Sequence, residues 1–211
     1  ASFLNQGQIC LCASRILVHR PIYDDFVARL VESIKDLNVG DPQRSSSDLG
    51  SLISHEHQAK VMRFVQSALA DGGTVLCGGE VPEMSDELQE GAWFQPTVIV
   101  NVETSCKISM EEVFGPVVVV HPFDTEEEAI EIANGTQYGL ASTIWTQNLE
   151  RAHRVAAAMD TGLVWVNTWL HRDLRTPFGG MKNSGIGREG GHYSLDFYSN
   201  AQNICISLPR F

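Results

Sequence analysis

The chain has 211 residues, of which 43% are hydrophobic and 19% are charged, a composition typical of a soluble globular protein with a sizeable core. Its formal net charge of −11 argues against nucleic-acid binding, which needs clustered Lys and Arg. No apolar run approaches the roughly 18 residues of a membrane span, and no segment resembles a signal peptide. Five irregularly spaced cysteines are typical of reduced thiols. We therefore expect a cytoplasmic protein without nucleic-acid or membrane partners.

Helical patterns alternate with short apolar runs along the chain. In chain order, the predicted elements are a strand at 15–19, helices at 22–37 and 56–70, strands at 74–77, 97–100 and 117–121, a helix at 125–134, a strand at 140–145, a helix at 149–159 and a strand at 163–167. The β-branched run at 117–121 lacks alternation, so we expect it to be buried on both faces. This order predicts an α/β fold with a mainly parallel sheet flanked by helices.

Residues 204–208 alternate between apolar and polar side chains, as an exposed strand does. Because an unpaired apolar edge is a liability in water, this strand could pair with the sheet of a neighbouring subunit. Other large or thiol side chains are expected to be buried in the core: Trp93, Trp145, Trp165, Cys77, Cys106 and Cys205.

One cysteine near the start of the chain is a candidate nucleophile. Cys10 follows Gly7 and Gln8 in an F-x-x-x-G-Q-x-C pattern, with no second cysteine at metal-ligand spacing. A single thiolate is enough to attack a carbonyl carbon. The alternative is a buried structural cysteine, the common role of an isolated thiol. The neighbouring Cys12 is too close for an unstrained disulfide.

A second segment, E-x-F-G-P at 112–116, combines a carboxylate with an aromatic ring and a rigid Gly-Pro turn. The ionised carboxylate of Glu112 can accept hydrogen bonds from both hydroxyls of a sugar diol. The ring of Phe114 can flank a flat ring of a ligand. The alternative is a helix N-terminus with its customary acidic residues.

The third segment has the pattern P-F-G-G-x-K-x-S-G-x-G-R-E at 177–189. It contains a G-x-G-x-x-G match at 185–190, which indicates dinucleotide binding only after a strand and within a βαβ unit of about 30 residues. A glycine-rich loop precedes this match, and too few residues follow it. We therefore reject it as a dinucleotide site and expect its glycines to allow tight chain packing.

These three segments, in this order, resemble the motifs of the NAD(P)-dependent aldehyde dehydrogenases over essentially the whole chain. The resemblance implies the catalytic domain of that fold at 1–191 and a C-terminal oligomerisation segment at 192–211, in a homodimer or homotetramer. It implies Cys10 as the nucleophile, Glu112 on the nicotinamide ribose and Phe114 beside the nicotinamide. The implied cofactor is NAD, with NADP left open.

The same resemblance implies a covalent mechanism for a small-molecule aldehyde. The Cys10 thiolate attacks the aldehyde, its backbone N–H helps to hold the oxyanion, and a thioester forms and is hydrolysed to the acid. The family's nucleotide-binding half, glutamate general base and oxyanion-hole asparagine would all lie upstream of Ala1. We therefore expect the sequence to begin mid-protein and the chain not to turn over by itself.

The loop at 167–175 lines the substrate tunnel in this family, and here it carries Arg172 and Arg175. A guanidinium matches a carboxylate in bidentate geometry. The loop is similar to that of the muconic semialdehyde dehydrogenases, whose substrates carry a carboxylate far from the aldehyde. The resemblance implies 2-hydroxymuconic or 2-aminomuconic semialdehyde as substrate, Arg172 as its anchor, and Trp169 and Phe178 as further substrate-binding residues.

Several alternatives stay open. Arg172 could pair with Asp173 or Glu189 on the surface, in which case a neutral aromatic or aliphatic aldehyde becomes the expected substrate. The chain could also be a noncatalytic oligomerisation module, or a thiol hydrolase, although no His/Asp partner can be named for Cys10. His57 and Lys60 are expected to be exposed on a helix, and the family alignment would bring them toward the adenosine ribose. The histidines form no ligand cluster, so we predict no metal site.

Overall fold

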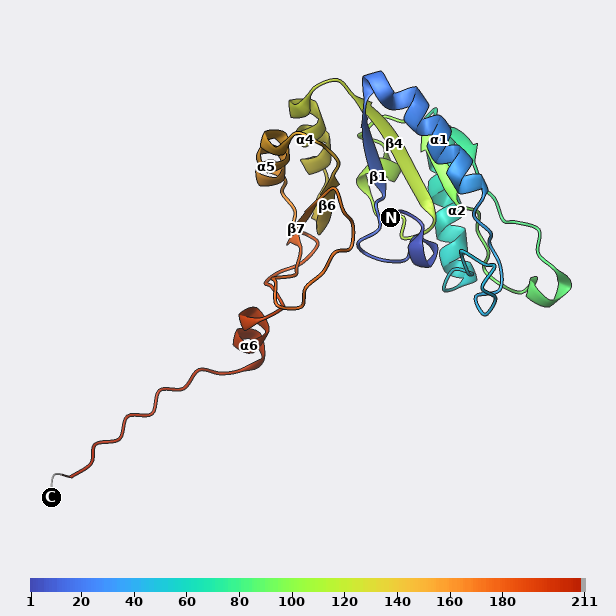
Figure 1. Cartoon of the computed structure of the whole chain (residues 1–211). Coiled ribbons are helices and arrows are strands. Elements are labelled where there is room, and N and C mark those ends of the chain that lie inside the picture. Colours follow the sequence, from blue (N-terminus) through green and yellow to red (C-terminus); the bar gives the residue numbers. More distant parts are fainter. Residues whose placement is uncertain (210–211) are drawn as a thin grey trace.

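The computed structural model describes residues 1–209, and its largest sheet has four strands (Figure 1). In spatial order these are β1 (Arg15–His19), β4 (Val117–Phe123), β3 (Thr97–Val100) and β2 (Thr74–Cys77). β1 and β3 pair with β4 in parallel, whereas β2 lies antiparallel at the edge. The predicted α/β fold with a mostly parallel sheet is confirmed.

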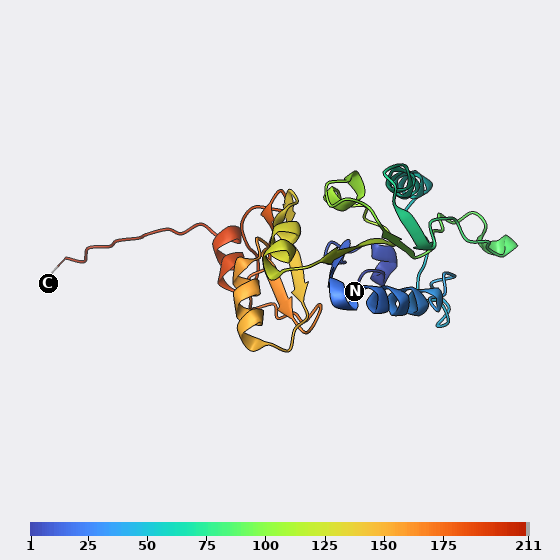
Figure 2. The ribbon, with the colours of Figure 1, turned by 90° about the horizontal axis from the view of Figure 1, so that it is seen from above.

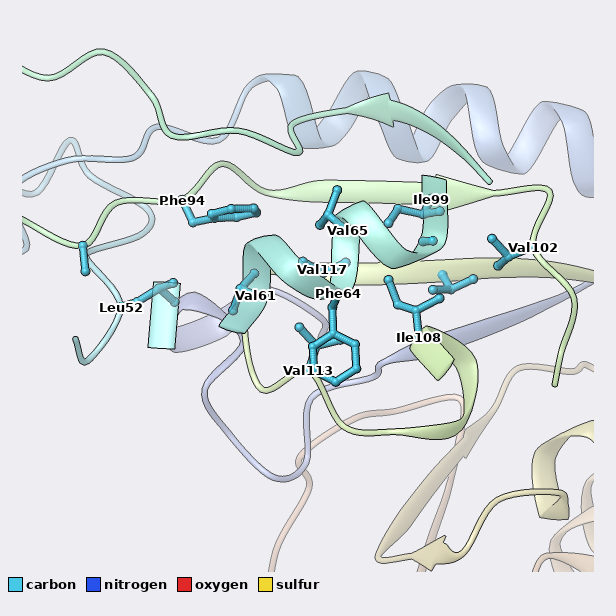
Figure 3. Packing of buried hydrophobic residues seen from close by; sticks show 13 residues of the cluster. Leu52, Val61, Phe64, Val65, Phe94, Ile99, Val102, Ile108, Val113 and Val117 are labelled. Carbon is cyan, nitrogen blue, oxygen red and sulfur yellow. The ribbon is translucent and has the colours of Figure 1, made fainter. Parts of the chain in front are cut away.

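Helices cover both faces of this sheet because its central strands are apolar on both sides. Val118 faces α1 (Tyr23–Lys35), whereas the next residue, Val119, faces α2 (His55–Ala70). Figure 3 shows the second of these clusters, in which α2 contributes Val61 and Phe64. β4 is buried on both faces from 117 to 121, as its lack of alternation predicts.

A second, smaller layer follows in the chain (Figure 2). β6 (Ala141–Ile144) and β7 (Leu163–Val166) pair in parallel, and α5 (Leu149–Ala158) contacts both strands and α4 (Glu126–Asn134). The Thr125 side chain accepts a hydrogen bond from the N–H of Glu128, which is the cap expected at the start of α4.

Arg15 joins the two layers. Its guanidinium, at the start of β1, donates to the carbonyls of Ile132 and Ala133 at 2.7 and 2.9 Å. These carbonyls belong to the last turn of α4, where a helix leaves such groups unsatisfied and favours a cation. Burial lowers the pKa of Arg15. The strand that follows Cys10 is therefore tied to the second layer.

The remaining elements are short. They are the 3₁₀ helices η1 (Leu4–Gly7), η2 (Arg20–Ile22) and η3 (Asp86–Leu88), the helix α3 (Lys107–Met110), and the paired strands β5 (Tyr138–Gly139) and β8 (Met181–Lys182). Between residues 1 and 209, no helix is long and apolar enough to cross a bilayer.

The C-terminal segment departs from the prediction. After α6 (His192–Tyr198), residues 199–209 form neither helix nor strand and extend away from the body of the molecule (Figure 1). The strand predicted at 204–208 is therefore wrong for the single chain. A strand needs a neighbour for its backbone hydrogen bonds, and no described segment pairs with this one. Ile204, Ile206 and Leu208 are exposed.

Two predictions of core positions are also wrong. Trp93 and Trp165 are buried as expected, but the side chain of Trp145, directly after β6, is 69% exposed. Cys205 lies in the extended C-terminal segment and is exposed as well. Both predictions assumed that neighbouring structure covers the apolar side chain. Trp145 follows a strand of a two-stranded sheet, and Cys205 lies in a tail that pairs with no other described segment, so neither side chain is covered.

Candidate active site

Left-handed backbone conformations gather in the three motif segments and in the 167–175 loop. Seven non-glycine residues have positive φ in the described part of the chain: Asn5, Gln6, Asn101, Phe114, Asn167, Leu170 and Lys182. All except Asn101 lie at 5–6, at 114 or at 167–182. Such a conformation costs a residue with a Cβ roughly 1–2 kcal/mol and persists only where its surroundings enforce it. The strain therefore marks the segments that carry the candidate site residues.

Cys10 lies exposed on a loop that two glutamine side chains hold in place. The Gln6 amide accepts from the backbone of Gly50 and donates to that of Ser51, both at 3.2 Å. Gln8 accepts from the backbone N–H of Ile53 at 3.1 Å. These hydrogen bonds attach the loop that carries Cys10 to the segment that precedes α2, and the thiol lies exposed on this attached loop.

Gly7 brings the Cys10 loop against the 112–116 turn. Its φ is +70°, and a Cβ added there would lie 2.2 Å from the carbonyl oxygen of Gly115. Only glycine permits both this conformation and this approach. The first and second motifs, about 100 residues apart in sequence, are therefore in direct contact.

The 112–116 turn rests on the first turns of α2. The carbonyl of Phe114 lies 2.6 Å from His57 Nε2, and Lys60 Nζ donates to the carbonyl of Glu112 at 3.4 Å. The Glu112 side chain is exposed and takes part in no ion pair among the described residues, whereas the Phe114 ring is partly buried. The turn thus presents one free carboxylate beside one aromatic ring.

Trp169 connects the third region to the Cys10 loop. Its indole N–H donates to the carbonyl of Leu11, the residue after Cys10, at 3.0 Å. On either side of Trp169, Asn167 and Leu170 adopt the left-handed backbone conformation, which shapes this loop. The predicted substrate-binding Trp169 is therefore next to the predicted nucleophile.

Arg172 stacks on Phe178 instead of pairing with a neighbouring acid. Its guanidinium carbon lies 4.4 Å from the centroid of the Phe178 ring, within the range of a cation–π contact. Asp173 is engaged by Arg175, which lowers the pKa of that carboxyl. No carboxylate of residues 1–209 forms an ion pair with Arg172. A stacked guanidinium keeps its in-plane N–H donors available for a ligand.

A cavity of about 510 Å³ lies beside this loop. Arg172 and Phe178 line it together with Trp165, Glu189 and Ser194. Neither Cys10 nor Trp169 belongs to its described lining. The structure therefore separates Arg172 and Phe178, which border the cavity, from Trp169, which lies at the nucleophile loop.

The third motif closes the chain onto the second layer. Lys182 donates to the carbonyls of Asn134 and Thr136 at 2.7 and 3.1 Å, and the Ser184 hydroxyl accepts from the N–H of Gly139 at 2.9 Å. The strand directly before the G-x-G-x-x-G match at 185–190 is the two-residue β8, and the helix α6 that follows has seven residues. Lys182 and Ser184 therefore hold this segment against residues 134–139, while the rejection of the glycine match as a dinucleotide site stays a prediction.

The two cysteines of the nucleophile loop differ in accessibility. Cys12 is partly buried, and this burial raises the pKa of its thiol, which disfavours the reactive thiolate. Cys10 is exposed at the turn that the Cys12 N–H closes onto the carbonyl of Ile9 at 2.8 Å. Among residues 1–209, no His, Cys, Asp and Glu side chains gather as a metal site. Cys10 is the better candidate nucleophile of the two.

The sequence did not reveal two of the contacts that assemble the site. The bonds from His57 to Phe114 and from Trp169 to Leu11 both end on backbone carbonyls. Every residue carries such a group, so no residue type marks the acceptor. The only available signal was for His57, which a family alignment would place near the cofactor.

Comparison with known proteins gives consistent results. Residues 1–204 match the aldehyde dehydrogenase family. The chain is 51% identical over 210 residues to 2-aminomuconic 6-semialdehyde dehydrogenase from Pseudomonas sp, covering 100% of this chain and 43% of that protein. It is 52% identical over 208 residues to 2-hydroxymuconic semialdehyde dehydrogenase from Pseudomonas putida, covering 99% and 43%.

Solved structures agree with this result. HpcC from Thermus thermophilus matches with a TM-score of 0.90 at 42% identity, covering 98% of this chain and 41% of that chain. Betaine aldehyde dehydrogenase from Staphylococcus aureus, in complex with NAD+, matches with a TM-score of 0.89 at 42% identity, covering 92% and 38%. The chain spans less than half the length of these relatives. On its sequence and its fold, it belongs to the aldehyde dehydrogenase family.

Proposed function

We propose that this chain supplies the nucleophile and part of the cofactor and substrate sites of an enzyme that oxidises an aldehyde to the acid. The observation that carries the proposal is the position of the Cys10 loop. Its exposed thiol lies between Gly7, which abuts the 112–116 turn, and Leu11, which accepts a hydrogen bond from Trp169. A nucleophile, a cofactor-type turn and a substrate-type loop therefore meet at one place.

The 112–116 turn fits a nicotinamide cofactor. The Glu112 carboxylate has both oxygens available for the two hydroxyls of a ribose, and Phe114 offers a ring beside it on a turn of fixed shape. When bound, such a cofactor accepts a hydride from the substrate carbon. NAD is our choice, since the Staphylococcus aureus relative was solved with NAD+.

The chain's own residues then act as follows. The Cys10 thiolate forms a bond to the aldehyde carbon, which gives a tetrahedral thiohemiacetal. The backbone N–H of Cys10 makes no hydrogen bond among the described residues and is available to the developing oxyanion. Loss of hydride leaves a thioester on Cys10, and water releases the acid from it.

For the substrate we propose a semialdehyde that carries a carboxylate, such as 2-hydroxymuconic or 2-aminomuconic semialdehyde. Arg172 supports this choice because it keeps its N–H donors free while Phe178 supports its face. The Pseudomonas relatives bear these substrate names. Arg172 is the proposed anchor of the carboxylate, and Trp169 and Phe178 are further proposed substrate-binding residues, Phe178 beside Arg172 and Trp169 at the Cys10 loop.

The test is steady-state kinetics with NAD+ on the full-length protein that carries this chain, with 2-hydroxymuconic semialdehyde and benzaldehyde as substrates. Arg172→Ala should lose a charge-assisted contact of roughly 2–4 kcal/mol, a factor of about 30–1,000 in kcat/KM, for the acidic substrate only. Arg175→Ala is the matched control, because Arg175 pairs with Asp173. It should leave both substrates within about twofold.

Other results select the alternatives. An equal loss on both substrates, or no loss on either, makes Arg172 structural and favours a neutral aldehyde. A wild-type protein that oxidises neither aldehyde, with Cys10 accessible to alkylation, overturns the proposed function and favours a noncatalytic module.

We also infer two segments with different roles, a catalytic domain at 1–191 and an oligomerisation segment at 192–211. The exposed apolar residues Ile204, Ile206 and Leu208 support this division, because a tail of this kind gains stability by pairing with a second copy. A homodimer or homotetramer follows. All five cysteines are unpaired, which favours a reducing compartment such as the cytoplasm.

A further inference from the structure

His57 lies where α2 meets the 112–116 turn. Its Nε2 is 2.6 Å from the carbonyl oxygen of Phe114. A carbonyl only accepts hydrogen bonds, so the geometry requires that Nε2 carries the hydrogen. The backbone of His57 is fixed as well, because its N–H donates to the N-cap hydroxyl of Ser54 at 3.1 Å. The donor is therefore held in one position by the start of the helix.

The hydrogen bond reaches the strained residue of the turn. Phe114 has a φ of +58°, a conformation that is unfavourable for phenylalanine without support. The next residue, Gly115, is pressed against α2, since a Cβ there would lie 2.7 Å from Val61 Cγ2. The Phe114 ring also meets the His57 ring edge to face, with 6.4 Å between centroids. Together these contacts restrict the 112–116 turn to one position on helix α2.

We propose that His57 is a positioning residue of the cofactor site. By holding the carbonyl of Phe114, it fixes the left-handed turn and with it the directions of the Phe114 ring and the Glu112 carboxylate. In this proposal His57 acts through the backbone of Phe114, to which its ring is hydrogen-bonded, and not as a ligand of the cofactor. This inference rests on the proposed function, since it assumes that the turn binds a nicotinamide cofactor.

The chain offers a matched control two residues away. His55 lies in the same first turn of α2, and its Nε2 also lies close to a backbone carbonyl, that of Glu90, at 3.0 Å. The two histidines share residue type, helix turn and kind of bond. The segment that they hold differs, since Glu90 lies in the connection before β3 and not in the cofactor turn. His55 is also more exposed than His57, and its Nδ1 lies 3.3 Å from the Gln58 side-chain oxygen.

The experiment compares wild type, His57→Leu, His57→Gln and His55→Leu in the full-length protein. We would measure NAD+ binding by calorimetry, KM for NAD+ and for the aldehyde, and the rate at which iodoacetamide alkylates Cys10. His57→Leu should weaken NAD+ binding about three- to tenfold, as expected for one lost hydrogen bond. The KM for the aldehyde and the alkylation rate should stay within about twofold. His57→Gln, which keeps an N–H donor, should restore most of the affinity, and His55→Leu should bind NAD+ like wild type.

Two results would overturn the inference while leaving the proposed function intact. One is wild-type NAD+ affinity in an active His57→Leu protein. The other is a His57→Gln protein as weak as His57→Leu, because the imidazole itself would then contact the cofactor. If His57→Leu does not fold, His57→Ala takes its place in both comparisons. A wild-type protein that neither binds NAD+ nor oxidises an aldehyde contradicts the proposed function itself.

Discussion

The indole of Trp169 donates a hydrogen bond to the carbonyl of Leu11, 158 residues earlier in the chain. Leu11 directly follows Cys10, so this bond ties the loop that carries Arg172 to the loop that carries the thiol. This contact therefore helps to set the relative position of the two loops.

Trp169→Phe tests this contact because it removes the N–H and keeps an aromatic ring. We expect kcat/KM for the aldehyde to fall about two- to tenfold, the usual effect of one hydrogen bond. The control is Trp93→Phe, which removes an equivalent indole bond to the carbonyl of Leu88 in a different part of the chain. That variant should lose thermal stability without a change in substrate kinetics. Equal kinetic losses in both variants would refute a specific role for Trp169.

Gly7→Ala tests the approach of the Cys10 loop to the 112–116 turn. The added Cβ meets both a positive φ and the carbonyl of Gly115 at 2.2 Å. Gly72→Ala separates the cost of the backbone conformation from the cost of the steric clash. Gly72 has a φ of +88°, but beyond its own chain neighbours no heavy atom of residues 1–209 lies within 4 Å of a Cβ added there. Urea unfolding should give a loss of about 1 kcal/mol for Gly72→Ala and more than about 3 kcal/mol for Gly7→Ala. Similar losses would mean that the loop moves aside without cost.

His121 should make the protein less stable in mild acid. This buried histidine lies beside Ser109 in the core, at 3.0 Å, and burial, with a contribution from the charge of Arg15, lowers its pKa to about 4. The unfolded chain therefore binds the proton more tightly than the folded chain. Stability from this group is complete above about pH 6.5 and falls as the pH drops toward about 4, by about 3 kcal/mol in total.

The measurement is the free energy of unfolding from about pH 7 to about pH 4 in wild type and His121→Gln. The slope with pH should be shallower in the variant, because the protonation-linked loss is absent. His153→Gln, which changes an exposed histidine, should keep the wild-type slope. Parallel curves for all three proteins would show that His121 is not the group responsible.

The C-terminal segment predicts a specific pattern of association. If residues 204–208 pair as a strand with a second copy, alternate side chains point to opposite faces. Ile206→Asp would then bury a charge and should weaken association at least about tenfold, as seen by light scattering during size-exclusion chromatography. Ser207→Asp, on the other face, should associate like wild type. A monomeric wild type would contradict the oligomer proposal.

The sequence predicted the strands of the large sheet well because they are short β-branched or apolar runs around a core in which β3 and most of β4 are buried on both faces. The runs at 15–19, 74–77 and 97–100 agree with β1, β2 and β3 at both ends. Such strands need no partner outside the chain, and their apolar character is the cause of their position. Local composition therefore contained the necessary information.

The failures have a different origin. The burial of Trp145 and the strand predicted at 204–208 both depend on a neighbouring layer, which local composition does not describe. The site divides in the same way. Cys10, Glu112 and Phe114 were found from motifs of side chains, whereas the bonds that assemble them end on the carbonyls of Leu11 and Phe114. A backbone acceptor leaves no trace in a sequence.

The hydrogen bond between Leu11 and Trp169 cannot form during protein synthesis until Trp169 has been added to the chain. At about 5–20 residues per second, a ribosome needs roughly 10–30 s to add the 158 residues that separate the two partners. Throughout that interval the Cys10 loop lacks the contact that ties it to the 167–175 loop. If the chain acts as proposed, the yield of protein with a reactive Cys10 thiol should therefore depend on the reducing capacity of the host during translation.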